Sequence, residues 1–135
     1  MAATFTAFTP PNPAFHFDWR TVERGVPISA LEAFAAYSGL SVKNLLEVVI
    51  PARTLKHRRQ RQEPLSEIET ERLRRVARIY DLTLKVYGDA NDAREWLISP
   101  KHRFDERTPL TLLRNQAGEE AVEEFLIQID EGMFV

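Results

Sequence analysis

The stretch PARTLKHRRQR, residues 51–61, carries the side chains with the clearest chemical potential in this chain. Ala52 and Leu55 are its only apolar positions, so the basic side chains of a helix here must mostly point outward. Lys and Arg neutralise phosphates, and Arg or Thr near the start of a helix can reach base edges. A solvated basic helix is the alternative. The residues predicted to contact DNA are Arg53, Thr54, Lys56, His57, Arg58, Arg59 and Arg61.

No set of residues in the sequence predicts catalysis. His16, His57 and His102 are far apart, without the i, i+4 spacing of a metal pair, and the chain has no cysteine. The five glycines are isolated, so no Gly-rich phosphate loop is present. We expect a protein that is not an enzyme and that uses no cofactor and no metal.

The formal charge of −2 hides a strong asymmetry. Residues 51–80 carry nine basic and four acidic side chains, whereas residues 104–135 carry two basic and eight acidic ones. The basic half suits a polyanion and the acidic end suits a cationic partner surface, although solvated helix faces would give the same totals. No segment has the pattern of a membrane span or a secretory signal, so we expect a cytoplasmic protein.

Residues 1–24 are predicted to form an N-terminal arm or tail, because Pro10, Pro11 and Pro13 oppose a regular helix. Aromatic side chains such as Phe15 exceed the needs of a solvated tail, so the arm could pack on the domain or on another copy.

The next residues have helical periodicity. Ser29 is expected to cap a first helix that Gly39 ends, and Ser41 to cap a second helix of about eight residues. Pro51 is expected at the first position of the basic helix. Residues 40–59 thus fit a helix-turn-helix, with Val49 in place of the usual turn glycine.

A long helix should follow, from a capping box at Ser66 and Glu69 to Gly88. Its other charges should form pairs within the helix: Glu71 with Arg74 and Arg75, and Asp81 with Lys85. Its predicted core face is Ile68, Leu73, Val76, Ala77, Tyr80, Leu84 and Tyr87.

Short helices are predicted in the last third of the chain. Ala93, Trp96 and Leu97 share one face, Pro100, Pro109 and Gly118 separate the helices, and a last helix covers residues 119–131.

These features resemble the Xre/MbcA/ParS antitoxins over about residues 25–132. The basic helix is similar to the family's Arg-Thr-Leu-x-x-Arg core, and Leu65, Ser66, Glu69 and Arg72 match the step that follows it. The C-terminal match is Gly88-Asp89, Ala93, Trp96-Leu97, Pro100, Pro109-Leu110, Leu112-Leu113, Gly118, Val122, Ile129 and Gly132. Two departures are Asn115, where the family commonly has Thr, and residues 104–107, which replace a Leu-Gly-Gly-like turn.

The resemblance implies an all-α protein with an Xre-like helix-turn-helix module at residues 25–79 and a small helical toxin-binding domain at residues 80–135. The implied partners are a RES-domain toxin, which consumes NAD or transfers its ADP-ribosyl group, and operator DNA. A homodimer within a larger toxin–antitoxin complex is expected, since paired recognition helices match a two-fold operator.

The acidic, apolar end of the chain is a candidate plug for the toxin's NAD pocket, although a frayed terminus is the simpler alternative. The candidate toxin-binding residues are Trp96, Pro109, Leu112, Leu113, Ile127, Asp130, Glu131, Met133, Phe134 and Val135. Two other functions remain open: a dimeric transcription regulator without a toxin, and an interaction adaptor without a DNA role.

Overall fold

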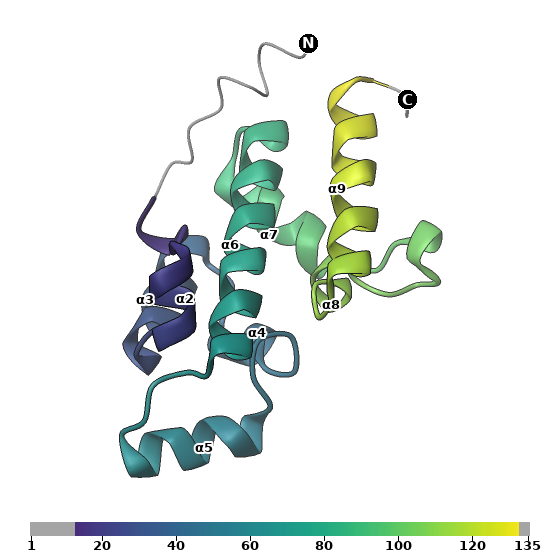
Figure 1. The fold of residues 1–135 in the computed structure, drawn as a ribbon. Helices are drawn as coiled ribbons and strands as arrows, with labels where there is room; N and C mark the ends of the chain where they lie inside the picture. The colour runs from purple at the N-terminus through teal and green to yellow at the C-terminus, as the bar shows by residue number, and fades with distance from the viewer. Residues whose placement is uncertain (1–12, 133–135) are drawn as a thin grey trace.

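A computed structural model describes residues 13–132, and this part of the chain is helical without a β-strand (Figure 1). The predicted all-α fold is therefore confirmed. The elements in order are η1 (Pro13–Phe15), α2 (Trp19–Arg24), α3 (Ile28–Ser38), α4 (Val42–Leu45), α5 (Ala52–Arg61), α6 (Glu67–Tyr87), α7 (Ala90–Ile98), η2 (His102–Phe104), α8 (Pro109–Leu112) and α9 (Gln116–Asp130).

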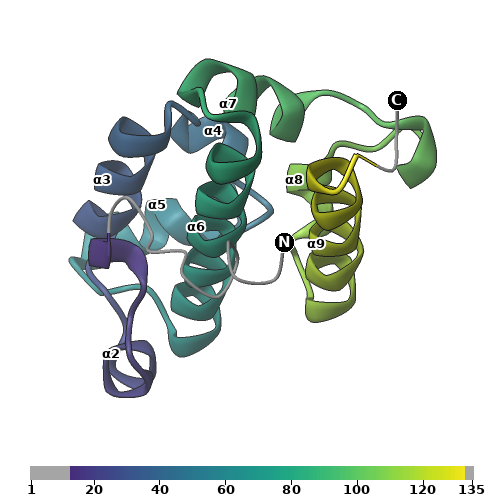
Figure 2. The same ribbon diagram turned by 90° about the horizontal axis from the view of Figure 1, so that it is seen from above.

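The long helix α6 is the central element of the molecule. Its start is the predicted capping box, in which Ser66 accepts from the Glu69 amide and Glu69 accepts from the Ser66 amide. Gly88 ends it in a left-handed conformation with φ of 70°. In Figures 1 and 2, α2 and α3 lie on one side of α6 and α9 lies on the other. One buried core cluster extends from Phe15 to Leu126 and includes residues of α6, so this helix contributes to the core of both proposed modules.

Residues 13–24 pack against the helices that follow, as the aromatic residues suggested. Phe15 is buried and contacts the rings of Phe34 and Tyr37. Asp18 caps α2 by accepting from the Thr21 amide. This segment therefore contributes a buried side chain, Phe15, to the hydrophobic core.

The predicted core face of α6 is wrong at Ile68, which is 65% exposed, and at Tyr87, which is 36% exposed. In the first turn of α6 the inward positions belong to Glu69 and Thr70 instead. Thr70 accepts a hydrogen bond from the Val26 amide, and Glu69 completes the capping box. Polar contacts to the loop before α3 and to the N-cap residue Ser66 therefore replace apolar packing in this turn. The other predicted positions are buried, apart from the half-buried Leu84.

The predicted ion pairs within α6 are only partly confirmed. Glu71 pairs with Arg74 at 3.4 Å, but Arg75 reaches across to Glu119 of α9 at 3.3 Å. Arg78 lies 2.9 Å from Glu119 and 2.8 Å from Glu123. These two carboxylates raise the pKa of the Arg78 guanidinium. The basic face of α6 therefore binds α9 and fixes the C-terminal half.

Asp81 was expected to pair with Lys85, but it points into the core. Its carboxylate accepts from the Tyr37 hydroxyl at 2.8 Å and lies 2.7 Å from His16 Nε2. Burial, followed by this carboxylate, raises the pKa of Tyr37. A buried carboxylate requires polar partners, and here they come from α3 and the N-terminal segment.

Candidate nucleic-acid and partner interfaces

The helix-turn-helix begins with α3, whose start differs by two residues from the prediction. Pro27 takes the N-cap position in an extended conformation, and Ser29 lies inside the first turn. Gly39 ends the helix as predicted, with φ of 80°. Ser41 then caps α4 in a capping box with Asn44, which confirms that helix start.

The second helix is half its predicted length, because α4 has four residues and ends at Leu45. Glu47 adopts φ of 68°, and its amide donates to the Ile50 carbonyl at 2.9 Å. The left-handed turn residue is therefore Glu47 and not Val49, which is buried in the core. The β-branched run before Pro51 favours extended backbone and explains why the helix stops early.

The basic helix α5 begins at Ala52, with Pro51 as the N-cap rather than the first helical residue. The Glu47 carboxylate accepts from the Ala52 amide at 3.2 Å. The sequence does not predict this contact, because Glu47 lies four residues before the N-cap Pro51 and no known capping pattern has that spacing. The contact stabilises the positive end of the α5 dipole.

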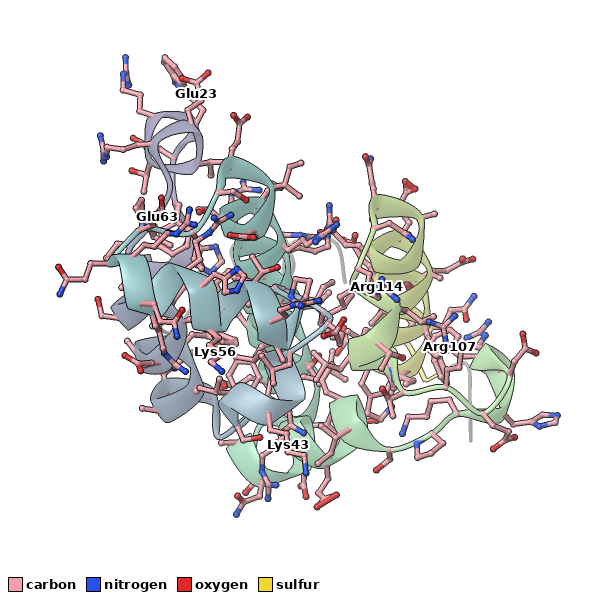
Figure 3. All side chains as sticks on the ribbon, turned by 90° about the horizontal axis from the view of Figure 1, so that it is seen from below. Glu23, Lys43, Lys56, Glu63, Arg107 and Arg114 are labelled. Atoms are coloured by element: carbon pink, nitrogen blue, oxygen red, sulfur yellow. The ribbon has the colours of Figure 1, made fainter. Side chains whose placement is uncertain are left out.

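The seven predicted DNA-contacting residues divide into two groups. Leu55 anchors α5 in the core, and Arg53, Lys56, His57 and Arg61 are exposed. Of these residues, Lys56 is labelled in Figure 3. No ion pair to another described residue involves any of these four. Thr54 is half-buried.

Arg58 and Arg59 instead face neighbouring helices. Arg58 donates to both oxygens of Glu69, at 3.3 and 3.2 Å, and lies 3.8 Å from Glu63. Arg59 is also exposed, and its guanidinium lies 3.3 Å from Glu32 of α3. These contacts hold α5 against the rest of the module, so the outward cationic surface is narrower than the sequence suggested.

The C-terminal half is built around Trp96. Asp89 caps α7, and Ala93, Trp96 and Leu97 are buried together, as predicted. The Trp96 ring contacts Phe125 at 5.6 Å and Tyr87 at 6.3 Å between centroids. Lys101 lies 5.1 Å from the Trp96 ring, and burial lowers the pKa of this lysine.

Residues 104–107 form a tight turn. Asp105 and Glu106 are both left-handed, with φ of 57° and 65°, and the Lys101 amide donates to the Arg107 carbonyl at 3.0 Å. Two successive left-handed residues are what a Gly-Gly pair would supply without strain. Asp105 and Glu106 therefore adopt the left-handed conformation of a glycine pair, although this chain has no glycine at these positions.

Gly118 does not separate helices, because it lies in the first turn of α9. That helix begins at Gln116, three residues before the predicted start. Asn115 caps it by accepting from the Gly118 amide at 2.8 Å. A Cβ at Gly118 would lie 1.7 Å from the Leu112 carbonyl oxygen. Glycine is needed here so that α8 and α9 can approach closely.

The candidate toxin-binding residues have different accessibilities. Trp96, Pro109 and Leu113 are buried and stabilise the fold of this half. Leu112 and Ile127 are half-buried, whereas Asp130 and Glu131 are exposed. Met133, Phe134 and Val135 lie outside the described residues.

Two family models match the chain. The antitoxin Xre-like helix-turn-helix domain matches residues 20–78, and the antitoxin Xre/MbcA/ParS C-terminal toxin-binding domain matches residues 84–132. The chain belongs to the Xre/MbcA/ParS antitoxin family. The first match covers α2 to most of α6, and the second covers the end of α6 through α9.

Two relatives named Antitoxin Xre are similar to this chain. The protein of Pseudomonas putida is 46% identical over 84 residues, which is 62% of this chain and 53% of the relative. This chain therefore spans about half the length of that relative. The protein of Yersinia enterocolitica is 23% identical over 116 residues, which is 84% of this chain and 78% of the relative.

Neither a metal cluster nor a membrane-spanning helix occurs within residues 13–132. No group of three or more potential ligands among His, Asp and Glu comes together there. None of the helices in this range is both long and apolar enough to cross a bilayer.

Proposed function

We propose that this chain is the antitoxin of a type II toxin–antitoxin pair. It binds and neutralises a RES-domain toxin that consumes NAD or transfers its ADP-ribosyl group, and it represses its own operon by binding DNA. Residues 80–135 carry the toxin contact, and the exposed side of α5 carries the DNA contact.

One observation supports both activities: a helix-turn-helix domain and a toxin-binding domain of the same antitoxin family match successive parts of one helical molecule. On α5, Arg53 and His57 are four residues apart and both exposed, so they share one helix face. That face carries the base contacts in this proposal, and Lys56 and Arg61 beside it neutralise phosphates.

The toxin contact involves the exposed surface of α8 and α9. Leu112 and Ile127 contribute accessible apolar area, and Asp130 and Glu131 add negative charge at the end of α9. A carboxylate-rich surface suits a cationic partner, such as a pocket that binds a dinucleotide phosphate.

Blocking of the toxin's NAD pocket is assigned to the last residues of the chain. Gly132, with φ of 73°, turns the backbone away from the axis of α9. Met133, Phe134 and Val135 follow it and would enter the pocket in this proposal. Binding and blocking are then separate: α8 and α9 hold the toxin, and the end of the chain occupies its site.

Co-expression with the adjacent gene, followed by NAD turnover measurements, tests this function. Full-length chain should bind the neighbouring RES protein and suppress its NAD consumption. Removal of residues 132–135 should restore turnover while the complex persists. Equal inhibition by the shortened chain would exclude the plug and leave steric occlusion by the helical body.

Operator binding separates the remaining alternatives. Specific DNA binding without a toxin partner would identify a plain transcription regulator. Toxin binding without salt-dependent DNA binding would identify an interaction protein that does not act on DNA.

A further inference from the structure

We propose that a second copy of this chain docks on the surface formed by α2 and the first turn of α6, which contains Trp19, Val22 and Ile68. We call it the α2–α6 surface. The proposal extends the proposed function, because reading a two-fold operator requires two paired α5 helices. What is new is the location of the contact and the orientation of the two copies.

The α2–α6 surface is unusually apolar for solvent-facing residues. Trp19 is 62% and Ile68 65% exposed, and only Tyr87 joins them as an exposed large hydrophobic residue within residues 13–132. Val22 connects them, because it lines both a hollow of about 530 Å³ beside Trp19 and one of about 400 Å³ beside Ile68. Adjacent exposed apolar residues of this kind are typical of protein contacts.

Ile68 has no role in the core of its own chain. The inward positions of that helical turn are occupied by Glu69, which accepts from the Ser66 amide, and Thr70, which accepts from the Val26 amide in the loop before α3. Rotation of α6 to bury Ile68 would break both contacts. Within residues 13–132 the Ile68 side chain is left 65% exposed, so we assign its cover to a partner.

The charges around the α2–α6 surface indicate that the partner is an identical copy. The hollow beside Trp19 is lined by four carboxylates and by Arg74, and two of the carboxylates, Asp18 and Glu23, line this hollow alone. The hollow beside Ile68 shares Glu67 and Glu71 with the first, and it adds three cationic residues that the first lacks: Arg72, Arg75 and Arg114. Figure 3 shows Glu23 and Arg114 on opposite sides of the start of α6.

A two-fold axis near Val22 would bring the acidic end of one copy onto the cationic end of the other. An isologous interface requires this self-complementarity, because the same surface must meet itself after a half-turn. Arg72 and Arg114 make no ion pair with another described residue, so both are available for the contact. The first turn of α6, which forms part of this surface, follows the loop after α5. The dimer would therefore fix the distance between the two recognition helices.

Analytical ultracentrifugation of the full chain tests the proposal. The unmodified chain should be a dimer at micromolar concentration. Ile68→Glu should raise the dissociation constant by about ten- to a hundredfold, since it replaces a buried apolar side chain with a charge. Tyr87→Glu is the matched control, because it makes the same kind of change at the far end of α6 and should leave the dimer intact.

Charge reversal provides a second measurement that does not depend on the apolar residues. Glu23→Arg alone and Arg72→Glu alone should each weaken the dimer, and the two changes together should restore it. Circular dichroism of each variant should give the helix content of the unmodified chain.

A monomeric unmodified chain would overturn the proposal, as would a folded Ile68→Glu chain that remains fully dimeric. Loss of toxin capture by Ile68→Glu without loss of self-association would assign the surface to the toxin instead. If the dimer depends on Ile68 but the chain binds neither toxin nor DNA, the surface stands and the proposed function fails.

Discussion

Replacing Gly118 with Ala reverses the usual effect of this substitution in a helix. Gly118 lies in the first turn of α9, where Ala normally stabilises by up to about 1 kcal/mol through helix propensity. In this structure an added Cβ would lie 1.7 Å from the Leu112 carbonyl oxygen and 2.7 Å from its carbonyl carbon. The obstacle is backbone, which cannot rotate away as a side chain can.

The balance of the two effects can be estimated. Forcing extra volume into a close-packed contact costs about 1–3 kcal/mol, and a rigid backbone neighbour places the cost at the upper end of that range. After subtraction of the propensity gain, Gly118→Ala should lower the free energy of unfolding by about 2 kcal/mol. For a chain of this length, that loss corresponds to a fall in Tm of about 7 °C.

Thermal and urea unfolding of the purified chain measure this loss. Ala117→Gly is the control, because position 117 is exposed in the same helical turn and reports propensity alone. Displacement of α8 should also weaken partner binding through Leu112. A Gly118→Ala chain that melts at or above the temperature of the unmodified chain would refute the close approach of α8 and α9.

Four further substitutions test the contacts described above. Arg53→Ala should weaken operator binding in a gel-shift titration by about 1–3 kcal/mol without changing urea unfolding. Arg58→Ala should lower the free energy of unfolding by about 1–3 kcal/mol, because it removes the cation that faces Glu69. Trp96→Ala should cost about 3–5 kcal/mol in urea unfolding, and a stable variant that loses only toxin binding would show that Trp96 faces the partner. Asp81→Asn should speed proteolysis of the N-terminal segment, because it removes the charge that faces His16; cleavage at the unmodified rate would contradict this role.

The helix boundaries marked by local chemistry were predictable from the sequence. Ser66 with Glu69 formed the expected capping box, Ser41 capped α4, and Gly39 and Gly88 ended their helices in the left-handed region. Each of these signals depends on a few neighbouring residues, so no knowledge of the tertiary structure is required.

The errors arose where contacts between distant residues decide the outcome. Periodicity placed Ile68 in the core, but the loop before α3 takes Thr70 as its partner. Arg58 lies in the basic helix and was therefore predicted to contact DNA, and only the position of α6 shows that it donates to the Glu69 carboxylate instead. Gly118 looked like a helix boundary because its real constraint, the Leu112 carbonyl, comes from another helix.

The continuity of α6 limits how such proteins can be recombined. The helix supplies the first-turn contacts of the helix-turn-helix half, and Arg75 and Arg78 farther along bind Glu119 and Glu123 of the C-terminal half. A chimera that joins two relatives after α6 would therefore inherit its docking arginines from one parent and their acceptors from the other. The two family matches suggest a domain boundary near residue 84, but exchange of toxin specificity requires α6 from Arg75 onward to be transferred together with residues 84–132.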